Sequence, residues 1–124
     1  MKNYILLLLV VLSFSISSCG KDDGGVDVFI PNLSNGFFSQ ADNNLLFFIR
    51  PEKKNVNESD FSGDYTGNNV AGDLAGHFKN YDISFKITNG DDKDVTYTGK
   101  FIKGDPLKIQ LHGTNNKDLT LIQF

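Results

Sequence analysis

The sequence predicts an all-β domain, an antiparallel meander that curls into a small up-and-down barrel or a barrel-like sheet. Apolar and polar residues alternate with period two, most regularly at 81–88 and 107–112, as expected of strands with one buried face and one solvated face. Clusters of Gly, Asn and Asp separate these segments and are typical of tight turns. From Asp27 onward no segment shows the apolar period of an amphipathic helix.

Length and composition limit what the chain can be. Its 124 residues suffice for one small domain, and the 12% of aromatic residues separates it from disordered chains. With 12 Lys and Arg against 15 Asp and Glu, the net charge is −3, which gives no electrostatic support for a nucleic-acid partner. We therefore expect none.

A five-residue pattern that contains a glycine recurs three times, at 61–65, 74–78 and 97–101. Each copy reads large apolar, small, glycine, polar, aromatic. On a strand, the glycine lies on the same face as its two large neighbours, where it removes bulk at a bend that the aromatic rings then cover. Three such bends favour a curled sheet or a closed barrel over a flat sandwich.

The strands are expected in nine places along the chain. They are 27–30, 36–40, 45–50, 59–65, 70–78, 81–88, 95–103, 107–113 and 119–124. Eight or nine strands in sequence order fit an up-and-down barrel, and the architecture resembles that of lipocalins and streptavidin by analogy alone. No lipocalin signature is present, and Trp, which is frequent in those families, is absent.

Residues 1–18 are predicted to be a secretory signal peptide. One positive charge at Lys2 precedes an almost unbroken apolar run at 5–16, which ends in small residues. As a helix this run would be about 18 Å long, which is short of the hydrocarbon thickness of about 30 Å. The prediction is a signal-peptide helix ahead of the β domain.

The only cysteine lies where this signal peptide ends. Ile16, Ser17, Ser18 and Cys19 resemble a bacterial lipobox. The resemblance implies cleavage between Ser18 and Cys19, a diacylglyceryl thioether on Cys19 and a further acyl chain, such as palmitate, on the new N-terminus. Two or more chains anchor a protein stably. The alternative is an ordinary signal peptide with a cysteine nearby by chance, although a lone cysteine in an exported chain has no disulfide partner.

The residues after Cys19 carry a second resemblance. Lys21, Asp22 and Asp23 are similar to the Lys-Asp-Asp export signal of surface lipoproteins in Bacteroidota-type bacteria. This similarity implies an outer-membrane lipoprotein that faces the cell exterior, with the periplasmic face as the lesser alternative. A simple polar tether is the other interpretation. Both resemblances cover residues 1–23 only.

No catalytic, metal or cofactor site is predicted. Cys19 is assigned to lipid, no Gly-x-Ser-x-Gly turn is present, and neither His77 nor His112 has an identifiable partner. We therefore expect no enzyme. The acidic turn at 89–94 offers oxygen ligands within a short span but lacks the spacing of an EF-hand. A hairpin turn and a weak cation site both remain open for it.

The segment 45–49 is apolar on both faces of its expected strand. Either Phe37 and Phe38 cover its second face, or an exposed aromatic patch or the mouth of a cavity lies there. The predicted organisation is a signal peptide at 1–18, a lipidated tether at 19–26 and one β domain at 27–124.

The function expected from this organisation is that of a lipid-anchored binding module for a small apolar ligand, a glycan or a protein. The membrane is the expected partner of the lipid anchor. One alternative is an inhibitor or immunity protein that neutralises a secreted hydrolase or toxin. Another is an accessory subunit of an outer-membrane complex. The sequence does not indicate which residues bind a ligand.

Overall fold

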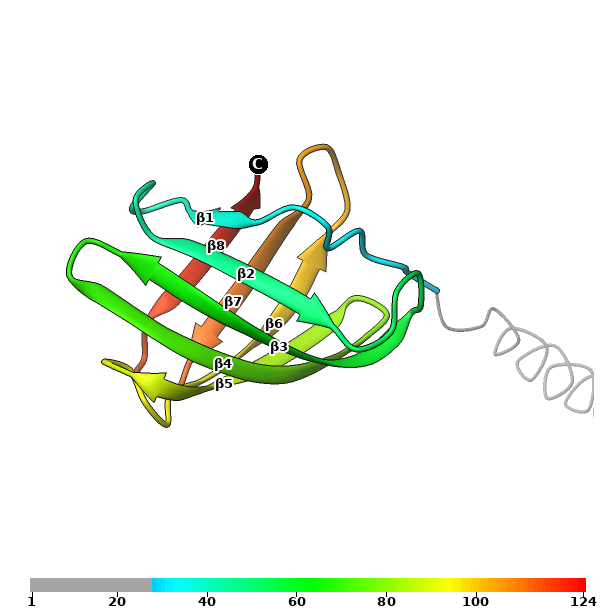
Figure 1. Cartoon of the computed structure of the whole chain (residues 1–124). Helices are drawn as coiled ribbons and strands as arrows, with labels where there is room; N and C mark the ends of the chain where they lie inside the picture. The colour runs from blue at the N-terminus through cyan, green and yellow to red at the C-terminus, as the bar shows by residue number, and fades with distance from the viewer. Residues whose placement is uncertain (1–27) are drawn as a thin grey trace, which may run out of the picture.

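Eight antiparallel strands follow one another along the chain and close into a barrel (Figure 1). The structure is a computed structural model that describes residues 28–124. The strands are β1 (Phe37–Ser39), β2 (Leu46–Pro51), β3 (Glu58–Gly67), β4 (Val70–Lys79), β5 (Asp82–Gly90), β6 (Thr96–Ile102), β7 (Lys108–Gly113) and β8 (Asp118–Gln123). Each strand pairs with its neighbours in sequence, and β1 also pairs with β8. The predicted all-β, up-and-down barrel is confirmed.

The prediction of a first strand at 27–30 is wrong. Residues 28–36 form no strand and instead cross one end of the barrel before β1 begins (Figure 1). Pro31 has no N–H to donate to a ladder, and Phe29 stacks on Tyr81 rather than pairing with a neighbouring strand. We call this segment the strap. Within residues 28–124, no helix is long and apolar enough to cross a bilayer.

The barrel interior is filled by aromatic and aliphatic side chains. Phe37, Phe78 and Phe85 are almost fully buried, and Phe61 lies against two of them, with ring centroids 6.3 Å from Phe78 and 6.4 Å from Phe85. The alternation in the sequence produces this packing, because every second residue of a strand points inward. Residues 28–124 thus supply a closed sheet and a core of their own, and we expect them to fold without residues 1–27.

The repeated glycines lie where backbones approach closely. Gly63 and Gly76 pair with large inward-facing neighbours on the adjacent strands. A Cβ atom on Gly99 would clash with the backbone carbonyl of Gln110, and one on Gly76 with the carbonyl of Ser84. A residue without a side chain is therefore needed at these points, where the neighbouring backbone carbonyls come very close.

We expect Gly99→Ala to lower the free energy of unfolding by about 1–3 kcal/mol, because the backbone of β7 must move to admit the methyl group. Gly104→Ala is the matched control, since its Cβ atom would lie 3.5 Å from its nearest neighbour, an ordinary contact. Urea unfolding of residues 28–124 measures both changes. Equal stabilities of the two variants would contradict the close-packing argument.

Candidate functional site

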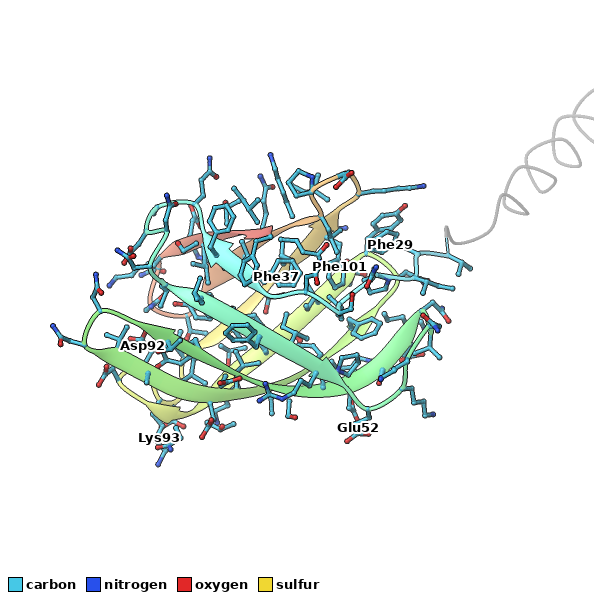
Figure 2. The ribbon with its side chains drawn as sticks, turned by 45° about the horizontal axis from the view of Figure 1, so that its top comes forward. Phe29, Phe37, Glu52, Asp92, Lys93 and Phe101 are labelled. Atoms are coloured by element: carbon cyan, nitrogen blue, oxygen red, sulfur yellow. The ribbon has the colours of Figure 1, made fainter. Side chains whose placement is uncertain are left out.

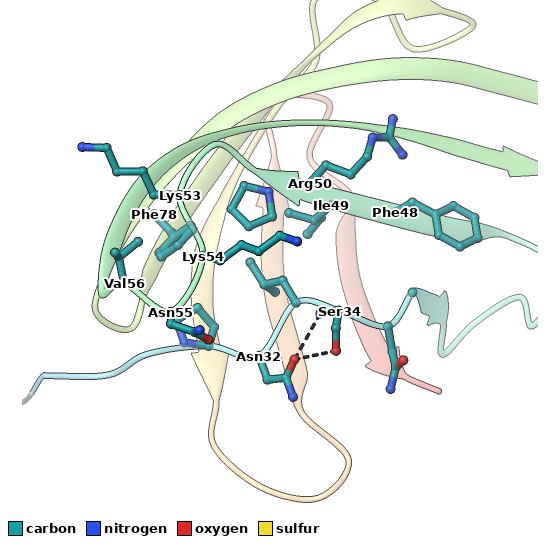
Figure 3. Close-up of a pocket in the computed structure, with 15 residues that line it drawn as sticks. Asn32, Ser34, Phe48, Ile49, Arg50, Lys53, Lys54, Asn55, Val56 and Phe78 are labelled. Carbon is teal, nitrogen blue, oxygen red and sulfur yellow. Dashed lines mark hydrogen bonds between the residues drawn. The ribbon is translucent and has the colours of Figure 1, made fainter.

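The strap lies across one end of the barrel and is fixed there by packing and hydrogen bonds. Leu33 inserts into the core and is only 8% exposed. The side-chain amide of Gln123, at the end of β8, donates to the carbonyl of Asn32 at 2.7 Å. Within the strap, the side-chain oxygen of Asn32 accepts hydrogen bonds from the backbone N–H and the hydroxyl of Ser34 (Figure 3). These contacts hold the strap in a single path.

Asn80 joins the strap to two other segments at the same end. Its buried side-chain oxygen accepts from the backbone N–H of Phe29 at 3.3 Å and from the amide of Asn57 at 3.1 Å. Its own backbone N–H donates to the carbonyl of Asn57 at 2.7 Å. Asn80 has a φ of 53°, a left-handed conformation that Asn tolerates better than most residues. One residue thus connects the strap, the β2–β3 loop and the β4–β5 turn.

Next to Asn80, the Phe29 ring completes the attachment of the strap. Its centroid lies 4.5 Å from that of Tyr81, with the rings nearly parallel, and 5.6 Å from that of Phe101. Figure 2 shows Phe29 and Phe101 together at this end of the barrel. The strap is therefore held at both ends, by this aromatic cluster and by β1.

A pocket of about 620 Å³ opens between the strap, the end of β2 and the β2–β3 loop (Figure 3). Its apolar walls come from Leu33, Ile49, Val56 and Phe78, of which all but Val56 are buried. Such a volume and such an apolar lining lie within the range of sites for small molecules. The pocket is a mouth of the barrel, set above the packed interior.

The charged residues that line this pocket are all cationic. They are Arg50, Lys53 and Lys54, and no Asp or Glu is among the lining residues. Lys54 extends from the loop across the pocket towards Ile49, whereas Lys53 and Arg50 point away from it (Figure 3). Arg50 is paired with Asp64 at 2.7 Å on the outer surface. Lys54 is thus the cation that faces the cavity.

The opposite end of the barrel is closed by tyrosines. The hydroxyl of Tyr65 accepts a long hydrogen bond from the backbone N–H of Asp92, and that of Tyr97 accepts one from the amide of Asn115. Burial raises the pKa of Tyr65 above 10.0, its ordinary value. Asp92 and Lys93 lie at this end, away from Phe29 and Glu52 (Figure 2).

The acidic turn at 89–94 has the geometry of a hairpin turn. The backbone N–H of Asp94 donates to the carbonyl of Ile87 at 2.8 Å, and that of Val95 to the carbonyl of Asp92. The carboxylate of Asp94 lies 3.5 Å from the ammonium of Lys86. In the part of the chain that the structure describes, no three His, Cys, Asp or Glu side chains are placed to hold a metal ion.

The apolar segment 45–49 buries only one of its faces completely. Phe47 and Ile49 point into the core, while Leu46 and Phe48 point outward and are half-buried. Of the two residues expected to cover that outer face, only Phe38 does so, because Phe37 lies inside the barrel.

Together the outward residues form a second apolar surface, over β8, β1 and β2, which meets the pocket at Phe48, a residue that also lines the pocket. We call it the outer patch, and its residues are Phe38, Leu46, Phe48, Ile122 and Phe124. The Phe48 and Phe124 rings meet edge to face with centroids 6.3 Å apart, and Phe124 remains 56% exposed. A hollow of about 380 Å³ between Phe38, Asn43, Leu46 and Phe124 adjoins them. An exposed aromatic patch, the alternative kept open by the sequence, is therefore present.

Both histidines lie on the outer surface of the barrel and pair with acids. The two ring nitrogens of His77 lie 2.7 Å from the carboxylate of Asp60 and 2.9 Å from that of Glu58. The hydrogen bond to Asp60, with a further one to Glu58, raises the pKa of His77 above 6.5. His112 lies 2.6 Å from Asp118. Sequence reasoning found no partner for either histidine, because these partners are on adjacent strands.

We expect NMR titration to give His77 a pKa above 6.5, and Asp60→Asn to lower it, since the imidazolium then loses its main acceptor. Because the pKa of His77 is raised in the folded state, its pairing with Asp60 and Glu58 stabilises the fold fully below pH 6.5. This contribution to the free energy of unfolding disappears as the pH rises through the folded-state pKa. From pH 6 to 8, wild-type protein should therefore lose more stability than His77→Gln. An unchanged pKa in Asp60→Asn would refute the assignment.

No protein-family model, curated protein or solved structure matches this chain. The candidate site therefore rests on the geometry of residues 28–124. The lipidation residue Cys19, the cleavage position after Ser18 and the export residues Lys21, Asp22 and Asp23 lie outside the described residues. What the structure shows is an eight-stranded up-and-down barrel, and the comparison with lipocalins and streptavidin is an analogy only.

Proposed function

We propose that this chain is a lipid-anchored outer-membrane lipoprotein whose barrel binds a small apolar ligand in the pocket under the strap. The role is one of binding and not of catalysis. The observation that carries this proposal is the pocket itself, a recess of about 620 Å³ with Leu33, Ile49, Val56 and Phe78 in its walls. Apolar walls with a few polar groups at the rim are typical of ligand sites.

The attachment of the strap supports a preformed site. Asn80 and Gln123 hold the strap from two sides by hydrogen bonds to its backbone, and Leu33 anchors it in the core. A wall that is already ordered does not lose further conformational freedom when a ligand arrives, which favours affinity. The pocket therefore has the properties of a built site.

The lipid anchor enters this proposal through the resemblance of residues 16–19 to a lipobox. If Cys19 carries the lipid, nine residues, 19–27, join it to the strap. Fully extended, they reach at most about 30 Å. Residue 28 starts at the end of the barrel that contains the pocket (Figure 1), so the pocket would open on the side of the tether.

The outer patch favours a second candidate function, in which the chain binds a protein as an inhibitor, an immunity protein or an accessory subunit. Aromatic residues gathered on an exposed surface are typical of protein interfaces. Phe38 and Phe124 lie in this patch and do not line the pocket, so variants at these positions separate the two candidates.

The pocket is tested with 1-aminoanthracene, an uncharged apolar fluorophore, added to residues 28–124. We expect saturable binding of one molecule per barrel. The emission of the bound fluorophore should shift to shorter wavelength, because the apolar pocket excludes water from it. Val56→Trp should reduce the affinity about tenfold, because the larger side chain would occupy the part of the pocket next to the apolar wall. Thr98→Trp is the matched control, since Thr98 is exposed on β6, away from the pocket.

Two outcomes would contradict the pocket assignment. The first is the absence of saturable binding to a barrel that unfolds cooperatively. The second is binding that survives Val56→Trp and is lost in Phe38→Ser, because the probe then occupies the outer patch, as the second candidate function requires.

The anchor is tested by Cys19→Ala in the full chain. We expect wild-type protein to fractionate with outer membranes, to be removed by protease from intact cells and to carry acyl chains by mass spectrometry. Cys19→Ala should leave the membrane fraction, since a barrel without acyl chains loses about 0.8 kcal/mol of membrane affinity for each buried CH₂. Wild-type protein that carries no acyl chains, or a Cys19→Ala variant that remains in the outer-membrane fraction, would refute the lipid assignment. Resistance of the wild-type protein to external protease would refute surface exposure.

A further inference from the structure

The charge of the pocket is opposite to that of the chain. The whole chain has a net charge of −3, yet the pocket is lined by three cations and by no carboxylate. Glu52 lies in the same loop, between Arg50 and Lys53, but is not among the lining residues. A site of this sign attracts anions and disfavours cations.

Within this lining, Lys54 is the residue placed to contact a ligand. Its side chain points into the pocket towards Ile49 (Figure 3), and both residues line this pocket. No ion pair or side-chain hydrogen bond to Lys54 is present within residues 28–124, whereas Arg50 is engaged with Asp64. A charge-assisted hydrogen bond to a ligand anion would give this ammonium group a partner.

Apolar surface lies directly next to this cation. Leu33 and Phe78 are 8% and 2% exposed and belong to the barrel core, and Ile49 and Val56 extend the apolar surface towards the loop. A molecule that satisfied the whole pocket would therefore need two unlike parts, an apolar body for these side chains and an anionic group for Lys54. A purely apolar ligand would contact only the apolar side chains and would make no use of the Lys54 ammonium group.

We propose that the pocket binds a single-chain amphiphile with a carboxylate head, with its apolar body against Leu33, Ile49 and Val56 and its head on the ammonium group of Lys54. This inference rests on the proposed binding function, because it names the chemical class of ligand for the same pocket. The head lies near the open rim, since Lys54 is exposed to solvent, and the body points towards the core.

The test uses decanoate and 1-decanol, which share an alkyl chain and differ in charge, as competitors of bound 1-aminoanthracene at pH 8. The protein is residues 28–124, as wild type, Lys54→Met and Lys53→Met. Both variants remove one positive charge from the same loop and leave the unbranched stem. They differ in direction, because Lys54 crosses the pocket and Lys53 points away.

We expect Lys54→Met to lower the affinity for decanoate about tenfold, the size expected for the loss of one hydrogen bond to a charged group. The affinity for 1-decanol should change by less than about twofold. Lys53→Met should lower the affinity for decanoate clearly less than Lys54→Met does, because it removes a contribution to the field and no direct contact, and it should change the affinity for 1-decanol by less than about twofold. Raising the salt concentration should weaken the binding of decanoate, because salt screens the attraction between its carboxylate and Lys54, whereas 1-decanol has no charge to screen.

The failures of this inference and of the proposed function are distinguishable. If 1-decanol competes and decanoate is insensitive to Lys54→Met, the carboxylate inference is overturned and the apolar binding function stands. Equal losses in Lys54→Met and Lys53→Met would also overturn the inference, since the general field of the loop and not Lys54 would then attract the anion. If neither compound competes and 1-aminoanthracene itself does not bind, the proposed function fails, and this inference with it.

Discussion

The closure of the barrel by β1 is the constraint on which the other features depend. This strand has only three residues, yet it pairs with β2 on one side and with β8 on the other. Phe37, its first residue, is completely buried, and the backbone N–H groups of Ser39 and Gln40 extend the pairing to Leu45 and Thr120. Closure removes both open edges of the sheet, which would otherwise expose unpaired backbone groups.

The position of β1 also sets where the pocket and the outer patch lie. Because β1 is short, the chain before it leaves the sheet at one end of the barrel and crosses there as the strap. The same strand turns Phe37 inward and Phe38 outward, so it contributes to the core and to the outer patch at once. Gly36 makes this junction possible, since its Cα packs beneath the Phe48 and Phe124 rings, where a side chain would clash.

The sequence predicted the fold well because local patterns determine most of it. Period-two alternation located β2 to β8 to within about two residues, and the repeated glycines indicated the curl of the sheet. The exception is 27–30, where Phe29 and its apolar neighbours resemble a strand. Its actual contact, the stacking of Phe29 on Tyr81, joins positions far apart in sequence. No local pattern shows such a contact.

The candidate site was not predictable for the same reason. Lys53, Lys54 and Val56 stand in what the sequence shows only as a polar loop between two strands. They become a pocket wall because Asn80 joins this loop to the strap. Asn80 is 23 residues from its partner in the loop, Asn57, and 51 residues from its partner in the strap, Phe29. The direction of Lys54 depends on the path of the loop. A pair of lysines followed, after Asn55, by a valine was the only signal, and it is equally typical of a solvated turn.

The strap gives the barrel a mechanical weak point at its N-terminal side. A pulling force applied at residue 28 acts first on the stacking of Phe29 with Tyr81 and on the single hydrogen bond to Asn80. The contacts of Asn32 and Leu33 come next along the chain, and the β1 ladders to β2 and β8 follow. These attachments bear the load one after another, so tension would peel the strap away and widen the pocket before it broke the sheet.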